Sequence, residues 1–213
     1  LYILFLMGFT IFNNKYFNNL NFPTINEFKI TGLNRDTEIM LQKKLQKYLS
    51  KNIFNLKNSD IESTINSFDI IDKYSIFKKY PKSLEIKVEE AEFLAITKID
   101  SKNYFLGSNG KLIKSNKNEK YTPFIFGNFD NKDFFELKKK IDSSNLNYKE
   151  IKNLFFFPSK RVDIELQNGV IIKLPNSNIK ESLNLSLDLL KKDNFEEVKL
   201  IDVRQSNQVI VNE

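Results

Sequence analysis

The chain has 213 residues, of which 41% are hydrophobic and 28% charged, with a formal net charge of +6. It contains neither cysteine nor histidine, which excludes disulfides, thiolate metal sites, the Ser-His-Asp triad and most zinc sites. The 33 basic residues include only three arginines, and the lysines are interspersed with acidic residues, so the positive charge does not indicate nucleic-acid binding.

The chain begins with an unbroken apolar run over residues 1–12. Twelve helical residues rise about 18 Å, less than the ~30 Å of a bilayer core. Because the run has no polar face and no small-x-small cleavage site follows it, we expect residues 1–13 to be the outer part of a truncated transmembrane helix. A signal-peptide core is the alternative. Residues 14–25, rich in Asn and containing Pro23, are typical of a linker.

Residues 26–92 predict the order β-α-α-β-β. A short strand ending at Gly32 precedes a helix that Asn34 or Asp36 begins. A second helix is predicted to begin with a capping box of Ser59 and Glu62. Two strands then flank Pro81, which excludes a helix there. The residues expected in the core are Phe28, Ile30, Leu41, Leu45, Tyr48, Leu49, Ile61, Ile65, Phe68, Leu84, Ile86 and Val88.

Residues 93–213 predict mostly strands. Asn109-Gly110 suits a two-residue hairpin turn, and Asn168-Gly169 forms a second hairpin turn. Two amphipathic helices are predicted, and two last strands fold at Ser206-Asn207. The helix faces expected in the core comprise Phe134, Leu137 and Ile141 in the first helix and Ile179, Leu183, Leu187 and Leu190 in the second.

Several segments resemble the FtsQ/DivIB family, in its alphaproteobacterial form. "G-L-N" at residues 32–34, "N-I-F-N-L" at 52–56 and "Y-P-K-S-L-E-I-K-V-E-E" at 80–90 are similar to its POTRA domain. "R-V-D-I-E-L-Q-N-G-V-I-I-K-L-P" at 161–175 and "I-D-V-R" at 201–204 are similar to its β domain. Glu90 and Glu92 depart from the family pattern, which usually has Arg and Pro there.

The resemblance implies an α+β chain: a partial transmembrane segment (1–13), a linker (14–25), a POTRA domain (26–92) and a mixed β domain with an antiparallel sheet and flanking helices (93–213). It implies a non-enzymatic cell-division scaffold, single-pass in the bacterial inner membrane, with its bulk in the periplasm at the division septum. The expected partners are FtsB- and FtsL-type membrane-anchored coiled-coil proteins and other divisome proteins. No cofactor, metal, nucleic acid or small-molecule substrate is implied.

The expected partner-binding residues lie near the carboxyl terminus. By resemblance, the partner adds a strand to the terminal strand, and arginines of two other strands contact it. An arginine fork can hold a partner carboxylate with two hydrogen bonds, which lysine cannot do. The alternative is that both arginines pair within the chain. Gln205 stands where the family often has an aromatic residue. The predicted contacts are Arg161, Asp202, Val203, Arg204, Gln208, Val209, Ile210 and Val211.

Two other functions are compatible with parts of the pattern. A POTRA-bearing component of an outer-membrane assembly or secretion system would carry tandem units or a barrel, but this chain has one unit and too few strands. An envelope enzyme could use Glu89, Glu90 and Glu92 as carboxylates, but their place at a strand end is typical of a solvated edge. Neither is favoured.

Overall fold

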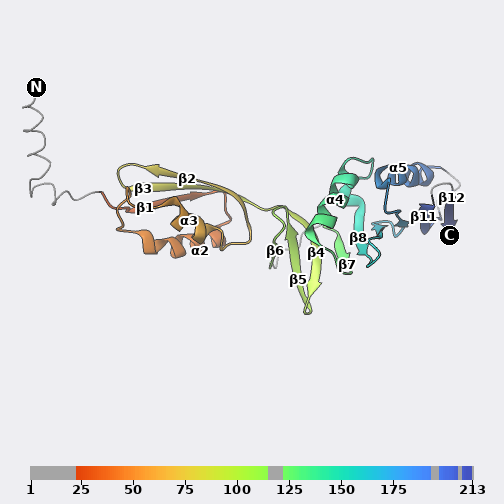
Figure 1. Ribbon diagram of the computed structural model, residues 1–213, viewed down its shortest axis with the longest axis horizontal. Helices are drawn as coiled ribbons and strands as arrows, with labels where there is room; N and C mark the ends of the chain where they lie inside the picture. Colours follow the sequence, from red (N-terminus) through yellow and green to blue (C-terminus); the bar gives the residue numbers. More distant parts are fainter. Residues whose placement is uncertain (1–22, 115–121, 193–196, 206–207, 213) are drawn as a thin grey trace, which may run out of the picture. The chain divides into compact units, whose positions relative to one another are not determined.

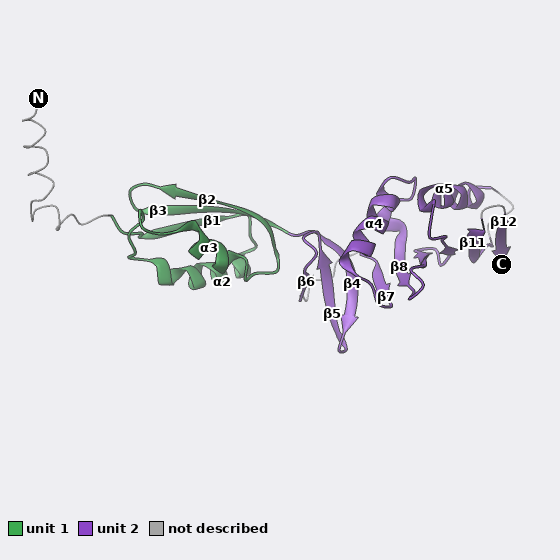
Figure 2. Cartoon of the chain, viewed as in Figure 1, with its two compact units in different colours: residues 1–90 green, residues 91–213 purple. Residues whose placement is uncertain are grey.

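The structure is a computed structural model that describes residues 23–114, 122–192, 197–205 and 208–212. It divides the chain into two compact units, residues 1–90 and 91–213 (Figure 2). The expected anchor, most of the expected linker and the Ser206-Asn207 turn lie outside the described residues. Within the described ranges, no helix has the length and apolarity needed to span a bilayer.

Unit 1 contains the predicted β-α-α-β-β order (Figure 1). Its sheet has the order β1-β3-β2, in which β1 runs parallel and β2 antiparallel to β3. Its core joins strand and helix residues, including Leu41, Leu45, Ile61, Leu84 and Ile86. The elements are β1 (Glu27–Thr31), α2 (Arg35–Leu45), the 3₁₀ helix η2 (Gln46–Tyr48), α3 (Asn58–Ile65), β2 (Ile71–Lys79) and β3 (Ser83–Glu90).

The two helix starts of unit 1 differ in how well the sequence predicts them. Asn34 caps α2, since its side chain accepts a hydrogen bond from the Thr37 N–H at 3.1 Å. The predicted capping box at α3 is wrong: the helix begins at Asn58, and Lys57 occupies the cap without a side-chain bond. Ser59 therefore lies inside the helix, one residue after its start.

The described residues of unit 2 form a nine-stranded sheet and two α-helices. The strand order is β12-β11-β10-β9-β8-β7-β4-β5-β6. The elements are β4 (Phe93–Ile99), β5 (Lys102–Gly107), β6 (Leu112–Ile113), β7 (Phe124–Phe126), α4 (Asn131–Asp142), η3 (Tyr148–Glu150), β8 (Ile151–Phe156), β9 (Val162–Leu166), β10 (Ile171–Lys173), α5 (Ile179–Leu190), β11 (Leu200–Gln205) and β12 (Gln208–Asn212).

This sheet is mixed, so the expectation of an antiparallel sheet is wrong. The pairs β4–β7, β7–β8 and β10–β11 are parallel, and the others are antiparallel. For β7–β8 and β10–β11 the physical reason is that α4 connects β7 to β8 and α5 connects β10 to β11. A helical crossover returns the chain in its original direction, which makes the two flanking strands parallel.

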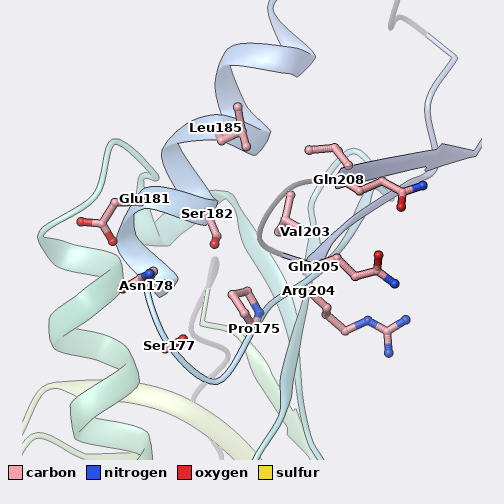
Figure 3. A pocket seen from close by; sticks show the side chains of 11 residues that line it. Pro175, Ser177, Asn178, Glu181, Ser182, Leu185, Val203, Arg204, Gln205 and Gln208 are labelled. Atoms are coloured by element: carbon pink, nitrogen blue, oxygen red, sulfur yellow. The ribbon is translucent and has the colours of Figure 1, made fainter.

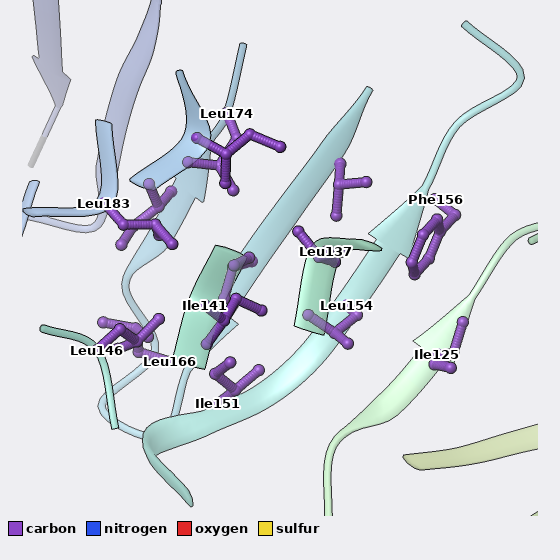
Figure 4. Packing of buried hydrophobic residues seen from close by; sticks show 14 of the residues in the cluster. Ile125, Leu137, Ile141, Leu146, Ile151, Leu154, Phe156, Leu166, Leu174 and Leu183 are labelled. Atoms are coloured by element: carbon purple, nitrogen blue, oxygen red, sulfur yellow. The ribbon is translucent and has the colours of Figure 1, made fainter. Parts of the chain in front are cut away.

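Both helices of unit 2 bury their apolar stripes in one core (Figure 4). Leu137 and Ile141 of α4 and Leu183 of α5 pack with strand residues such as Leu154 and Ile164. The strand residues that alternate with these core positions therefore share the opposite, helix-free face of the sheet.

The two Asn-Gly hairpins close three-residue loops, not the two-residue loop expected at the first. The Gly107 N–H bonds to the Lys111 carbonyl, and the Leu166 N–H bonds to the Val170 carbonyl, both at 2.9 Å. Each loop ends in a glycine with positive φ, +74° at Gly110 and +88° at Gly169. A glycine in that position is what three-residue hairpin loops require.

Candidate functional site

The terminal strand β12 is the last strand at one edge of the unit 2 sheet. It pairs antiparallel with β11, with Ile201 opposite Val211 and Asp202 opposite Ile210. On its other side, no strand among the described residues pairs with it. Half of the N–H and C=O groups of an edge strand point away from its neighbour, so β12 carries main-chain groups able to bond another polypeptide.

The side chains of β12 alternate between the two faces of the sheet. Val209 and Val211 are half-buried and pack against the core of unit 2. Gln208, Ile210 and Asn212 are exposed, and Ile210 is 44% exposed. The predicted terminal contacts thus comprise two residues that hold β12 in the sheet and two, Gln208 and Ile210, that face solvent.

A register shift in β11 determines which residues near β12 reach the surface. It lies between Asp202 and Gln205, where β11 contains one residue more than β12. Val203 is buried at 5% exposure, whereas Arg204 and Gln205 are exposed. Val203, which was predicted as a partner contact, is therefore part of the core beneath β11 and β12 and not of the exposed surface.

Asp202 and Arg204 form the first of two Asp–Arg pairs. The Arg204 Nε donates to both carboxylate oxygens of Asp202, at 2.8 and 3.0 Å, its Nη2 donates to Oδ2, and its backbone N–H donates to Oδ1 at 3.1 Å. These hydrogen bonds lower the pKa of the Asp202 carboxyl and raise that of Arg204. A guanidinium has five N–H donors, so the Nη1 side remains for a further acceptor.

Arg161 and Asp163 form the second pair, with poorer geometry. Nε lies 3.2 Å from Oδ1, but the two atoms are not aligned as a hydrogen bond, and both are buried without a hydrogen-bond partner. Burial raises the pKa of the Asp163 carboxyl, and Arg161, Lys173 and Arg204 oppose that shift. The Arg161 guanidinium lies 3.9 Å from the Phe157 ring centroid. The Asp163 carboxylate and the Phe157 ring thus hold Arg161 from two sides.

The register brings the two pairs onto one face. Asp163, Lys173 and Asp202 lie opposite one another across β9, β10 and β11. Arg161 and Arg204 both line one cavity of about 320 Å³. The structure thus brings both predicted arginines to one cavity, each already paired with a neighbouring aspartate. Arg204 lies on β11, next to the edge strand, whereas Arg161 directly precedes β9, two strands further into the sheet.

A groove lies on the opposite, helix-covered side of β12 (Figure 3). It has a volume of about 470 Å³ and lies between α5 and the last two strands. Leu185, 47% exposed, lines it from the helix, and Val203 and Val209 line it from the strands. The Arg204 side chain extends away from α5. The groove was not predicted; the available signal was Leu185, an apolar residue outside the predicted stripe of α5.

Two of the three acidic residues at the end of β3, Glu89 and Glu90, have side-chain contacts within unit 1. Glu90 accepts hydrogen bonds from the backbone N–H and side-chain amide of Asn34, at 2.7 and 2.6 Å, and so holds the start of α2. Glu89 pairs with Lys73 at 3.4 Å on the surface. In the part of the chain that the structure describes, no cluster of three or more metal-ligating side chains occurs.

Comparisons with known proteins match both units. Residues 24–91 match the family model "POTRA domain, FtsQ-type", and residues 95–204 match "Cell division protein FtsQ/DivIB, C-terminal". Cell division protein DivIB of Clostridium botulinum (strain Loch Maree / Type A3) is 28% identical over 170 residues, covering 70% of this chain and 64% of that protein. Cell division protein FtsQ of Agrobacterium fabrum is 22% identical over 212 residues, covering 96% and 61%.

The chain thus spans less than two thirds of the length of these relatives. Among solved structures, the major extracytoplasmic domain of the trans isomer of DivIB from Geobacillus stearothermophilus is 15% identical, with a TM-score of 0.36. That similarity covers 48% of this chain and 92% of the other.

Proposed function

Because the chain belongs to the FtsQ/DivIB family of cell division proteins, we propose that it is a non-enzymatic scaffold that binds other division proteins through the free edge of β12. The partners would be FtsB- and FtsL-type membrane-anchored coiled-coil proteins. One of them would add a strand to β12. Main-chain hydrogen bonds would supply affinity, and alternate side chains would supply specificity.

The observation that carries this proposal is the position and composition of β12. Its sequence, QVIVN, contains no charged residue in a chain in which 28% of residues are charged. Exposed edges of natural sheets usually carry charges or proline that block the addition of another strand. An uncharged edge with an exposed Ile210 therefore favours addition of a strand at this edge.

The surroundings of β12 support a partner strand with two different faces. Side chains directed to the helix side would meet the groove beside Leu185 and Val209. Side chains directed to the other face would meet Ile210 and the Nη1 side of Arg204. A partner strand that alternates apolar residues with an acidic residue fits both.

We further propose that residues 1–13 anchor the chain in the inner membrane and that both units lie in the periplasm at the septum. Two features support this topology: the resemblance of the sequence to the FtsQ/DivIB family and the apolar run at residues 1–12. The alternative of an outer-membrane assembly component has no support from the matched FtsQ/DivIB C-terminal region at 95–204.

The test is co-purification of the chain with FtsB- and FtsL-type proteins, combined with fluorescence microscopy of the tagged full-length protein in dividing cells. We expect a stable complex and a band at midcell. A chain that fails to retain either coiled-coil protein, or that distributes evenly over the cell envelope, would contradict the proposal.

A further inference from the structure

One end of unit 1 gathers the segment where the described chain begins and the turns that face it. Thr24 forms a bridge with Asn52, and the Asn26 N–H donates to the Lys82 carbonyl at 2.9 Å. The start of β1 and the β2–β3 turn lie at the same end of the unit (Figure 1). We call this region the amino-terminal end of unit 1; it comprises residues 23–27, 46–60 and 78–86.

Two exposed aromatic rings stack on each other at this end. Phe54 and Tyr80 come from different turns, and their ring centroids are 5.0 Å apart with 24° between the planes. Phe54 is 54% exposed and Tyr80 is 58% exposed. A phenyl ring beside a phenol that keeps its hydroxyl in water is the kind of pair found at the boundary between lipid and water.

Lysines are frequent at the same end of unit 1 as the aromatic pair. The amino-terminal end of unit 1 contains six lysines and three acidic residues, so its net charge is positive. One acid, Glu85, pairs with one of these lysines, Lys79, at 3.3 Å, which leaves the net charge unchanged. Clustered lysines next to a membrane segment bind the negatively charged surface of anionic lipids. The lysines are Lys47, Lys51, Lys57, Lys78, Lys79 and Lys82, and the acids are Glu27, Glu85 and Asp60.

The position of this end in the chain identifies the surface that it meets. Ten residues separate the apolar run at 1–12 from Pro23, and ten residues span at most about 35 Å. We propose that the amino-terminal end of unit 1 contacts anionic phospholipid headgroups, with Phe54 and Tyr80 in the interface and the lysines on phosphates. The proposal rests on the proposed function only for the membrane location of the apolar run.

The absence of tryptophan from the chain allows a direct test. Phe54→Trp places one fluorophore in the full chain, which is reconstituted without any partner into vesicles containing brominated phosphatidylcholine. One set of vesicles also contains 30% phosphatidylglycerol, an amount chosen to give a clear negative surface. The matched control is Phe126→Trp, an exposed phenylalanine of unit 2 (44%) that stacks on Phe155.

We expect brominated lipid to quench Phe54→Trp when phosphatidylglycerol is present, and to leave Phe126→Trp unquenched. Adding Lys51→Gln and Lys82→Gln should weaken the contact about five-fold for each lysine removed, and the quenching should fall accordingly. Equal quenching with and without phosphatidylglycerol, or at both tryptophans, would overturn the proposal. Absence of quenching at Phe54→Trp in both sets of vesicles would overturn it as well. Partner affinity at β12 is measured separately, without lipid, so the two proposals fail independently.

Discussion

The two edges of the unit 2 sheet are built in opposite ways. β6, at one edge, has two residues, Leu112 and Ile113, and lysines flank it at positions 111 and 114. β12, at the other edge, has five residues, none of them charged, and Glu213 follows it in the sequence. Short strands and lysines are the means by which proteins block unwanted strand addition. The same sheet therefore protects one edge and leaves the other available.

This difference shows that the free edge of β12 is not a general property of the fold. The side chains of Val209 and Val211 anchor β12 to the core, and no other strand of the described residues pairs with its outer rim. If the contrast is functional, changes at β12 should affect partner binding and matched changes at β6 should not.

Proline substitution in β12 should have the largest effect. N–H direction alternates along a strand, so one of Val209 and Ile210 directs its N–H toward β11 and the other directs it outward. Proline at the outward position should lower the affinity for an FtsB-type partner about a hundred-fold or more, with little change in the melting temperature. Proline at the inward position should lower both. Isothermal titration calorimetry and thermal unfolding measure the two effects.

The matched control for that prediction is Leu112→Pro in β6, which should leave partner affinity unchanged. An unaltered dissociation constant in both β12 variants would remove the edge-strand account.

A charge placed on the rim of β12 should have the next largest effect. Ile210→Lys adds the type of residue that protects natural edges and removes apolar area from the interface. We expect partner affinity to fall about ten-fold. Leu112→Lys, at a residue 36% exposed on β6, is the control and should have no effect. Equal losses in the two variants would mean that the edges do not differ in function.

The two Asp–Arg pairs provide a smaller contrast, because Arg204 lies on the strand next to β12 and Arg161 precedes β9, two strands further in. Arg204→Lys removes the planar fork whose Nη1 side is available, so partner affinity should fall about five- to ten-fold. Arg161→Lys should change affinity less, because Arg161 is packed on Phe157 and paired with a buried Asp163. Surface plasmon resonance measures the partner affinity of both variants. A larger loss of affinity in Arg161→Lys than in Arg204→Lys would place the partner contact away from β12.

The two aspartates should make stability depend on pH with opposite signs. The lowered pKa of Asp202 gives a stabilising contribution that is present above about pH 4 and is lost in more acidic solution. The raised pKa of Asp163 gives a contribution that is present in acid and is lost as the pH rises above about 4. As the pH rises, the free energy of unfolding of Asp202→Asn should therefore fall relative to that of the parent chain. The free energy of unfolding of Asp163→Asn should rise relative to that of the parent chain. Urea unfolding from pH 3 to 7 measures this; parallel slopes would contradict it.

Periodicity predicted the elements of both units well. Alternation at Leu84, Ile86 and Val88 and the helical stripe at Phe134, Leu137 and Ile141 correspond to buried faces, because burial imposes these periods directly. Leu49, expected on the stripe of α2, is instead 36% exposed, since the helix tightens into η2 before it. The family suggested by the residues is confirmed by the matched family models.

Strand pairing and side-chain pairing were harder to predict. Alternation does not encode which strands are neighbours, so the parallel pairs made by α4 and α5 were missed. The sequence left open whether Arg161 and Arg204 pair within the chain, because that depends on β11 register and on the positions of Asp163 and Asp202. The partner-binding role of these residues stays a prediction.

Amide hydrogen exchange of β12, with and without a saturating FtsB-type partner, tests the central claim most directly. In the free chain, amides that bond to β11 should be protected and the alternating outward amides should exchange fast. Partner binding should slow the outward amides of residues 208–212 and leave those of β6 unchanged. If β12 exchange is the same in the complex as in the free chain, no strand is added at this edge and the account is contradicted.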